Sequence, residues 1–122
     1  MLSLAVRAQF PRVANLLLDA GADVNKQSGD RGYSPLMDAV QKGDVAMVKL
    51  LLEHGAVTDQ RSKDGQTALI ICAGRGDEDM AEFLVMHGAD PQIKDNLGMS
   101  AAGYAKLFNN RKMMELFNPA PA

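Results

Sequence analysis

Few side chains in this chain of 122 residues could carry out acid–base, nucleophilic or metal chemistry. The candidates are two histidines, His54 and His87, and a single cysteine, Cys72. A zinc site would need further ligands converging on a histidine, and the sequence offers no His-x-x-x-His spacing. Each histidine stands just before a glycine, where a cation interacts favourably with the C-terminal end of a helix. We interpret both as helix-terminal cations and predict no metal and no cofactor.

The remaining candidate motifs also have structural explanations. Cys72 stands where Ala39 and Ala105 stand one repeat earlier and later, which favours a buried core thiol over a nucleophile. Arg75-Gly76-Asp77 spells a cell-adhesion tripeptide, but it also suits a helix end, a turn glycine and an N-cap. Gly-rich phosphate loops, paired acid–base carboxylates and nucleophile elbows are absent from the sequence. We therefore predict that the protein is not an enzyme.

Composition sets further limits on function. Thirteen basic and fifteen acidic side chains give a formal net charge of −2, without the basic excess that nucleic-acid binding usually needs. The longest apolar runs, such as Leu50-Leu51-Leu52, are too short to cross a bilayer. We expect a soluble domain that binds neither nucleic acid nor membrane. Its expected location is cytoplasmic by default, and periplasmic if an export signal was removed before Met1.

The sequence repeats with a period of 33 residues. Glycines at one register and hydroxyl residues at another recur at this interval: Gly32, Gly65 and Gly98, then Ser34, Thr67 and Ser100. The step from Gly21 to Gly55 is 34 residues, so one unit has an extra residue. Self-similarity of this kind is the signature of a repeat architecture. The period divides a single domain, 1–122, into a partial unit 1–28, units 29–61 and 62–94, and a C-terminal cap 95–122.

Each unit is predicted to form a pair of helices. The hydroxyl residue is a good N-cap, and in one unit Pro35 follows Ser34 at the first helical position. Ten residues later a second polar cap precedes a one-sided apolar pattern: Asp44, Asp77 or Asn110. One such pair cannot bury its apolar stripe alone, so neighbouring units must stack. The predicted fold class is an all-α repeat solenoid.

Several of these segments resemble ankyrin repeats. Asp64-Gly65-Gln66-Thr67-Ala68-Leu69 is similar to the start of a repeat, and Gly21-Ala22-Asp23-Val24-Asn25 to its end. Ser34-Pro35-Leu36-Met37-Asp38-Ala39 and the following Lys42-Gly43-Asp44 also match the family's pattern. The resemblance covers nearly the whole chain and implies about four helix-turn-helix units with short β-turn fingers. It specifies the fold better than the function, because the family has many unrelated partners.

Two further features have both a functional and a structural interpretation. Asn25 resembles the ankyrin asparagine that can be hydroxylated in animal proteins, although a hydrogen bond within its own turn is the simpler role. Methionines can form adaptable binding surfaces, but Met47, Met80 and Met113 share one register of the second helices. We predict that these three methionines fill the core.

The resemblance implies that the turn tips and the exposed side of the first helices form a concave groove that binds a partner. The expected groove positions of unit 29–61 are Asp30, Arg31, Tyr33, Asp38, Gln41 and Lys42. Those of unit 62–94 are Lys63, Asp64, Gln66 and Arg75. Those of unit 95–122 are Asn96, Leu97, Met99, Leu107 and Phe108. The last set is mostly apolar, which indicates either an interaction site or a cap over the core.

The predicted function is a non-catalytic protein–protein interaction module, monomeric when free, that binds a folded partner and occludes or inhibits an enzyme. A second resemblance, to small bacterial ankyrin proteins that act as immunity or self-protection factors, implies a hydrolase as the partner. It depends on compact size, the absent first turn before Leu2 and the Pro-Ala-Pro-Ala end at 119–122. The alternative is a structural scaffold or tethering fragment of a longer ankyrin protein.

Overall fold

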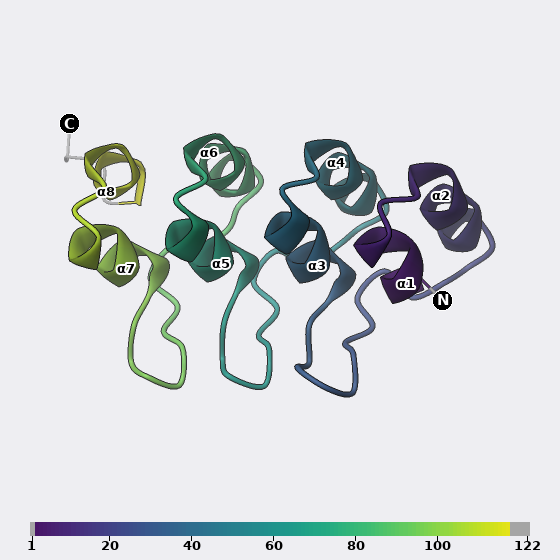
Figure 1. The fold of residues 1–122 in the computed structure, drawn as a ribbon, viewed down its shortest axis with the longest axis horizontal. Helices are drawn as coiled ribbons and strands as arrows, with labels where there is room; N and C mark the ends of the chain where they lie inside the picture. The colour runs from purple at the N-terminus through teal and green to yellow at the C-terminus, as the bar shows by residue number, and fades with distance from the viewer. Residues whose placement is uncertain (1, 118–122) are drawn as a thin grey trace.

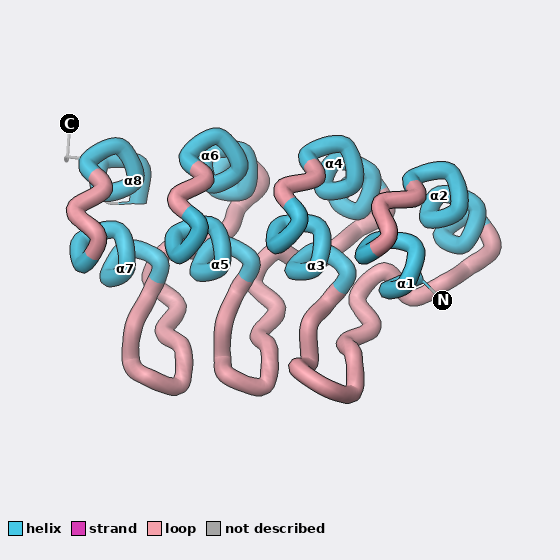
Figure 2. The backbone as a smooth tube through the Cα atoms, viewed as in Figure 1, coloured by secondary structure: helices cyan, strands magenta, loops and turns pink. Residues whose placement is uncertain are grey.

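The computed structural model describes residues 2–117, and its regular elements in that range are eight α-helices arranged in pairs. The pairs are α1 (Leu2–Arg7) with α2 (Pro11–Asp19), α3 (Pro35–Lys42) with α4 (Val45–Glu53), α5 (Ala68–Arg75) with α6 (Glu78–Met86), and α7 (Ala101–Leu107) with α8 (Arg111–Phe117). The pairs stack side by side in one row, and the loops between them extend from one side as fingers (Figures 1 and 2). The predicted all-α repeat solenoid is confirmed.

The helices begin and end where the repeated polar residues predict. The Ser34 Oγ accepts a hydrogen bond from the Met37 N–H at 3.2 Å, and Thr67 and Ser100 cap α5 and α7 in the same way. Asp44, Asp77 and Asn110 likewise accept from the amides three residues later at the starts of the second helices. Between α3 and α4, Gly43 has a φ of 68°, a left-handed conformation that glycine adopts without strain. One helix pair falls within each unit proposed from the sequence.

Apolar side chains at one repeated register form the core between the pairs. Met47, Met80 and Met113 are at most 1% exposed, as predicted. The inner helices α1, α3, α5 and α7 pack in sequence against one another, and each also packs against the second helix of its own pair. Cys72 is fully buried in this core, as are Ala39 and Ala105 at its register. The small side chains at that register allow the inner helices to approach closely.

Hydrogen bonds between successive fingers join the units on the other side of the inner helices. The Lys63 N–H donates to the Arg31 carbonyl at 3.0 Å, and one repeat later the Asn96 N–H donates to the Asp64 carbonyl at 3.0 Å. The Asn25 Oδ1 accepts from the Val57 N–H at 2.8 Å. The interpretation of Asn25 as a residue that bonds within its own turn was therefore incomplete: its side chain connects two repeats.

Some expectations fall outside the described part of the chain. Met1 and the Pro-Ala-Pro-Ala segment at 119–122 lie there. Within residues 2–117, no helix has the length and apolar character needed to cross a membrane.

Replacing Met80 by Ala tests whether the buried methionines stabilise the packing between neighbouring helix pairs. The substitution removes a buried side chain between helix pairs, and we expect the free energy of unfolding to fall by about 2–5 kcal/mol. Met86→Ala is the matched control, because Met86 is on the same helix but 75% exposed. Its effect should be within about 0.5 kcal/mol. Urea denaturation followed by circular dichroism measures both, and equal losses would contradict this account of the core.

Candidate protein-binding groove

Two adjoining hollows lie along the exposed side of the inner helices. The central hollow, of about 290 Å³, is lined by residues of three units: Tyr33, Gln41, Gln66, Ile70, Ile71, Gly74, Arg75, Tyr104 and Phe108. The N-terminal hollow has a similar volume, about 290 Å³, and is lined by Arg7, Asp30, Arg31, Tyr33, Asp38, Gln41 and Lys42. Because Tyr33 and Gln41 line both, we call the two hollows together the inner-helix groove.

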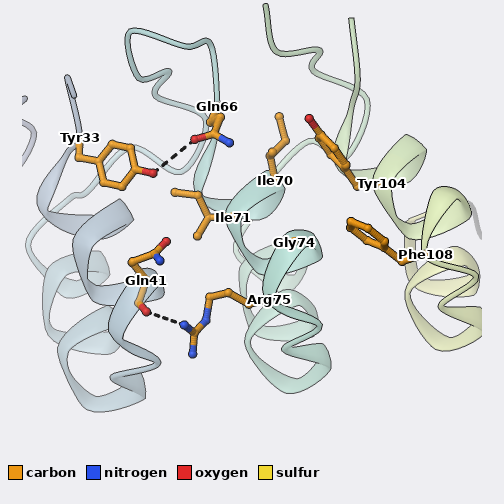
Figure 3. A pocket seen from close by; sticks show the side chains of 9 residues that line it. All are labelled: Tyr33, Gln41, Gln66, Ile70, Ile71, Gly74, Arg75, Tyr104 and Phe108. Atoms are coloured by element: carbon orange, nitrogen blue, oxygen red, sulfur yellow. Dashed lines mark hydrogen bonds between the residues drawn. The ribbon is translucent and has the colours of Figure 1, made fainter. Parts of the chain in front are cut away.

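Side chains that bond across repeats line the central hollow. The Tyr33 hydroxyl lies 3.3 Å from the Gln66 Oε1, to which it donates. The Arg75 Nη1 donates to the Gln41 carbonyl at 2.7 Å, as Figure 3 shows. On the opposite side, the rings of Tyr104 and Phe108 extend from α7 toward α5 (Figure 3). These two rings stack with their centroids 6.2 Å apart.

Four residues that line the central hollow lie outside the predicted partner-binding set. Ile71 and Tyr104 stand 33 and 66 residues after Asp38, Gly74 stands 33 after Gln41, and Ile70 precedes Ile71. Applying the repeat register to every groove position would have found Ile71, Tyr104 and Gly74. Because only polar positions were extended into unit 62–94, its apolar groove positions were overlooked.

Asp38 lines the N-terminal hollow, but its side chain is buried, whereas an exposed groove position was expected. Asp38 is 6% exposed, and the Arg7 guanidinium covers it, with Nε 3.3 Å from the Asp38 Oδ2. Burial raises the pKa of the Asp38 carboxyl, and the positive charge of Arg7 opposes that rise. Arg7 also lies 3.8 Å from Asp30. Hydrogen bonds from the Ser28 side chain and the Arg31 amide are the main causes that lower the pKa of Asp30 to about 2.

The other predicted partner-binding residues line neither hollow. Three of them lie in the fingers and take part in bonds between units: Lys63, Asp64 and Asn96. The Asn96 Nδ2, for example, donates to the Lys63 carbonyl at 2.9 Å. Leu97 and Leu107 are 84% and 65% exposed, and Met99 is partly buried. Their part in partner binding remains a prediction.

The inner-helix groove is more basic than the chain as a whole. It is lined by four basic side chains and two carboxylates, whereas the whole chain has a net charge of −2. Among residues 2–117, no carboxylate oxygen lies within 4.0 Å of the charged nitrogens of Arg31, Lys42 or Arg75. These three cations are therefore available to an acidic partner.

The residues that could do chemistry lie outside the groove lining. Burial, followed by the negative charge of Asp77, raises the pKa of the Cys72 thiol to about 12, so it is not a nucleophile near neutral pH. The His87 Nδ1 lies 2.9 Å from the Phe83 carbonyl within its own helix. The His54 Nδ1 lies 3.0 Å from the Leu50 carbonyl, and its Nε2 lies 3.2 Å from the Asp19 Oδ1. In the described range, no three metal-ligating side chains come together.

This stacked architecture and its groove are those of an ankyrin repeat protein. The chain belongs to the ankyrin repeat family: the family model for ankyrin repeats, in three copies, matches residues 2–95. Ankyrin repeats are generally protein–protein interaction modules, and the fold is generally non-catalytic.

Individual relatives share the repeats over different lengths. The chain is 46% identical to an ankyrin repeat-containing protein of Treponema pallidum (strain Nichols) over 116 residues, which are 95% of this chain and 39% of that protein. It is 49% identical to the 2-5A-dependent ribonuclease of Mus musculus over 55 residues, 45% of this chain and 8% of that protein. The solved ankyrin repeat domain of Bcl-3, a member of the IkappaB family, matches with a TM-score of 0.88 and 32% identity. That match covers 94% of this chain and 49% of the Bcl-3 chain, so this chain spans less than half the length of each relative.

The contact between His54 and Asp19 should make the stability of the first two helix pairs depend on pH. The Leu50 carbonyl and then the Asp19 carboxylate raise the pKa of His54 above its ordinary value of 6.5. A raised pKa in the folded state stabilises the fold below the ordinary value, and this stabilisation is lost as pH rises through the folded-state pKa. Asp19→Asn should lower the pKa of His54 in an NMR titration and reduce the gain in stability between about pH 8 and about pH 5.5.

The matched control is Asp79→Asn, which removes an exposed carboxylate that pairs with Lys112 instead. It should leave the His54 titration unchanged. A His54 pKa that is the same in the wild type and in Asp19→Asn would show that the ion pair does not form in solution.

Proposed function

We propose that this chain is a non-catalytic module that binds a folded partner protein through the inner-helix groove. The observation that carries the proposal is a set of three cations without a carboxylate partner, Arg31, Lys42 and Arg75. They lie in a groove whose central hollow is also lined by the exposed ring of Phe108. Aromatic and arginine side chains are the types that most often anchor protein interfaces.

The rigidity of the groove supports this role. The Tyr33 hydroxyl and the Arg75 guanidinium are each bonded to the neighbouring repeat, and the fingers are joined by backbone hydrogen bonds. Side chains that are already held in place lose little conformational entropy when a partner binds. The groove is therefore suited to binding a partner without rearranging.

Within this class we propose that binding occludes the working surface of an enzyme, with a hydrolase of the immunity or self-protection type as the candidate partner. The support is that a rigid domain of this size covers a surface without supplying chemistry of its own. The test is capture from the source organism with the wild-type chain and with Arg75→Glu as bait. A hydrolase retained by the wild type only, and inhibited by it in an activity assay, supports occlusion. Retention without inhibition contradicts it.

The second candidate is a structural scaffold or tether within a longer ankyrin protein. The observation that favours it is the exposure of apolar side chains on the first helix pair and its loop, where Leu4, Phe10 and Leu16 are 65%, 58% and 68% exposed. Helix pairs in this fold pack through such side chains. A partner that is lost on Leu4→Asp but retained by Arg75→Glu would favour this candidate over groove binding.

Truncation of the aromatic residues in the groove tests the binding face directly. Tyr33→Ala and Phe108→Ala should each weaken binding of the captured partner by about 1–3 kcal/mol, with unchanged helix content, because each removes an anchor side chain. Leu16→Ala is the matched control, since Leu16 is apolar and exposed but lies on α2. Isothermal titration calorimetry gives the affinities. If Phe108→Ala lowers the melting temperature and leaves the affinity unchanged, Phe108 is a cap over the core instead of an anchor.

A further inference from the structure

Gly74 is a glycine that the fold itself does not require. It lies in the last turn of α5, outside the set of positive-φ glycines, and a Cβ added there would meet no atom within 4 Å. Alanine is a better helix former than glycine at such a position. The residues at the same register in the neighbouring units, Gln41 and Leu107, both have long side chains. The effect of glycine at this position is to leave open space in the central hollow.

The space beside Gly74 is bounded mainly by apolar side chains. Ile70 and Ile71 are at most 6% exposed and lie beneath the surface of α5, while Tyr104 and Phe108 face the same space from α7 (Figure 3). A volume of about 290 Å³ is at the lower limit of the range for small-molecule sites, roughly 300–1,000 Å³. The hollow therefore suits one large side chain better than a whole cofactor.

A fixed positive charge adjoins this apolar space. Arg75 follows Gly74 in the chain, and its Nη1 is bonded to the Gln41 carbonyl, which holds the guanidinium over the end of α3. Its Nη2 lies 3.2 Å from the place where a Cβ of Gly43 would be. Lys42 and Arg31 continue the line of positive charge into the N-terminal hollow, with no carboxylate within 4.0 Å of either among the described residues.

We propose that the inner-helix groove takes an extended acidic segment of the partner protein, which inserts one large apolar side chain over Gly74. Carboxylates on one side of that apolar residue then lie against Arg75, Lys42 and Arg31. The charge complementarity selects the acidic segment, and the apolar lining beside Gly74 fixes its register. This inference rests on the proposed function and specifies the chemistry of the partner.

The probe is a phage-displayed library of random twelve-residue peptides, selected on the wild-type chain. Enriched peptides should share a Leu, Met, Phe, Tyr or Trp residue next to Asp or Glu. Synthetic copies should bind Gly74→Leu and Arg75→Glu at least about tenfold more weakly than the wild type, and binding should weaken with added salt. Arg12→Glu is the charge control, because Arg12 is an exposed residue on α2 outside the groove.

Gly74→Ala separates the effect on binding from the effect on folding. Because alanine favours the helix and has space for its methyl group, the thermal midpoint should stay the same or rise while the peptide affinity falls. A variant that binds less and melts at a lower temperature would overturn the assignment of Gly74 to binding.

The other outcomes distinguish this inference from the proposed function. The inference is overturned if the enriched peptides lack acidic residues, or if they bind Gly74→Leu as well as they bind the wild type. In either case, groove binding still stands if Tyr33→Ala lowers the affinity of the peptides. Peptides that are insensitive to every groove variant contradict the groove itself. A selection that enriches no peptide overturns the extended segment as the occupant and leaves a folded surface to be tested with the captured partner.

Discussion

The structure depends on burying one face of each helix pair against the next pair. A pair of helices of seven to nine residues has too little interior of its own, and the short inner helix α1 has only six residues. Met47, Met80 and Met113 are almost fully buried because neighbouring pairs enclose them. Hydrogen bonds between fingers extend the same stacking beyond the helices. Each unit therefore has a fixed position relative to its neighbours. The residues that line the groove come from successive units, so their relative positions are fixed as well.

The repeated geometry presents chemically different side chains at equivalent positions along the groove. Asp38, Ile71 and Tyr104 share one register, and Lys42, Arg75 and Phe108 share another. At both registers the character changes from charged to apolar toward the C-terminal unit. The backbone thus supplies regular spacing, and the side chains supply a surface that differs from one end to the other. A surface of this kind can fix both the direction and the register of a bound partner.

The fold could be predicted from local signals, whereas the groove could be predicted only in part. The repeated glycine and hydroxyl residues determine the backbone conformation only a few residues away, so the helix ends can be predicted directly from them. Tyr33, Gln41, Gln66, Arg75 and Phe108 line the central hollow as the family resemblance implied. The burial of Asp38 could not be predicted, because it depends on Arg7, a side chain from the preceding unit. A contact between residues 31 positions apart in the sequence leaves no sign in the local pattern of either residue.

Two glycines lie within inner helices, and they differ in how closely other atoms surround them. A Cβ on Gly103, in α7, would make ordinary van der Waals contacts with the Met99 Cε at 3.4 Å and the Ser100 Oγ at 3.5 Å. Gly74 has no such neighbours and could accept a methyl group without contact. Natural sequences depart from local preference most often where function requires it. Gly74 lies at the apolar end of the groove, beside Arg75, which has no carboxylate partner, and Asp38 lies at its charged end. Both residues line the inner-helix groove, the surface that we propose binds a partner.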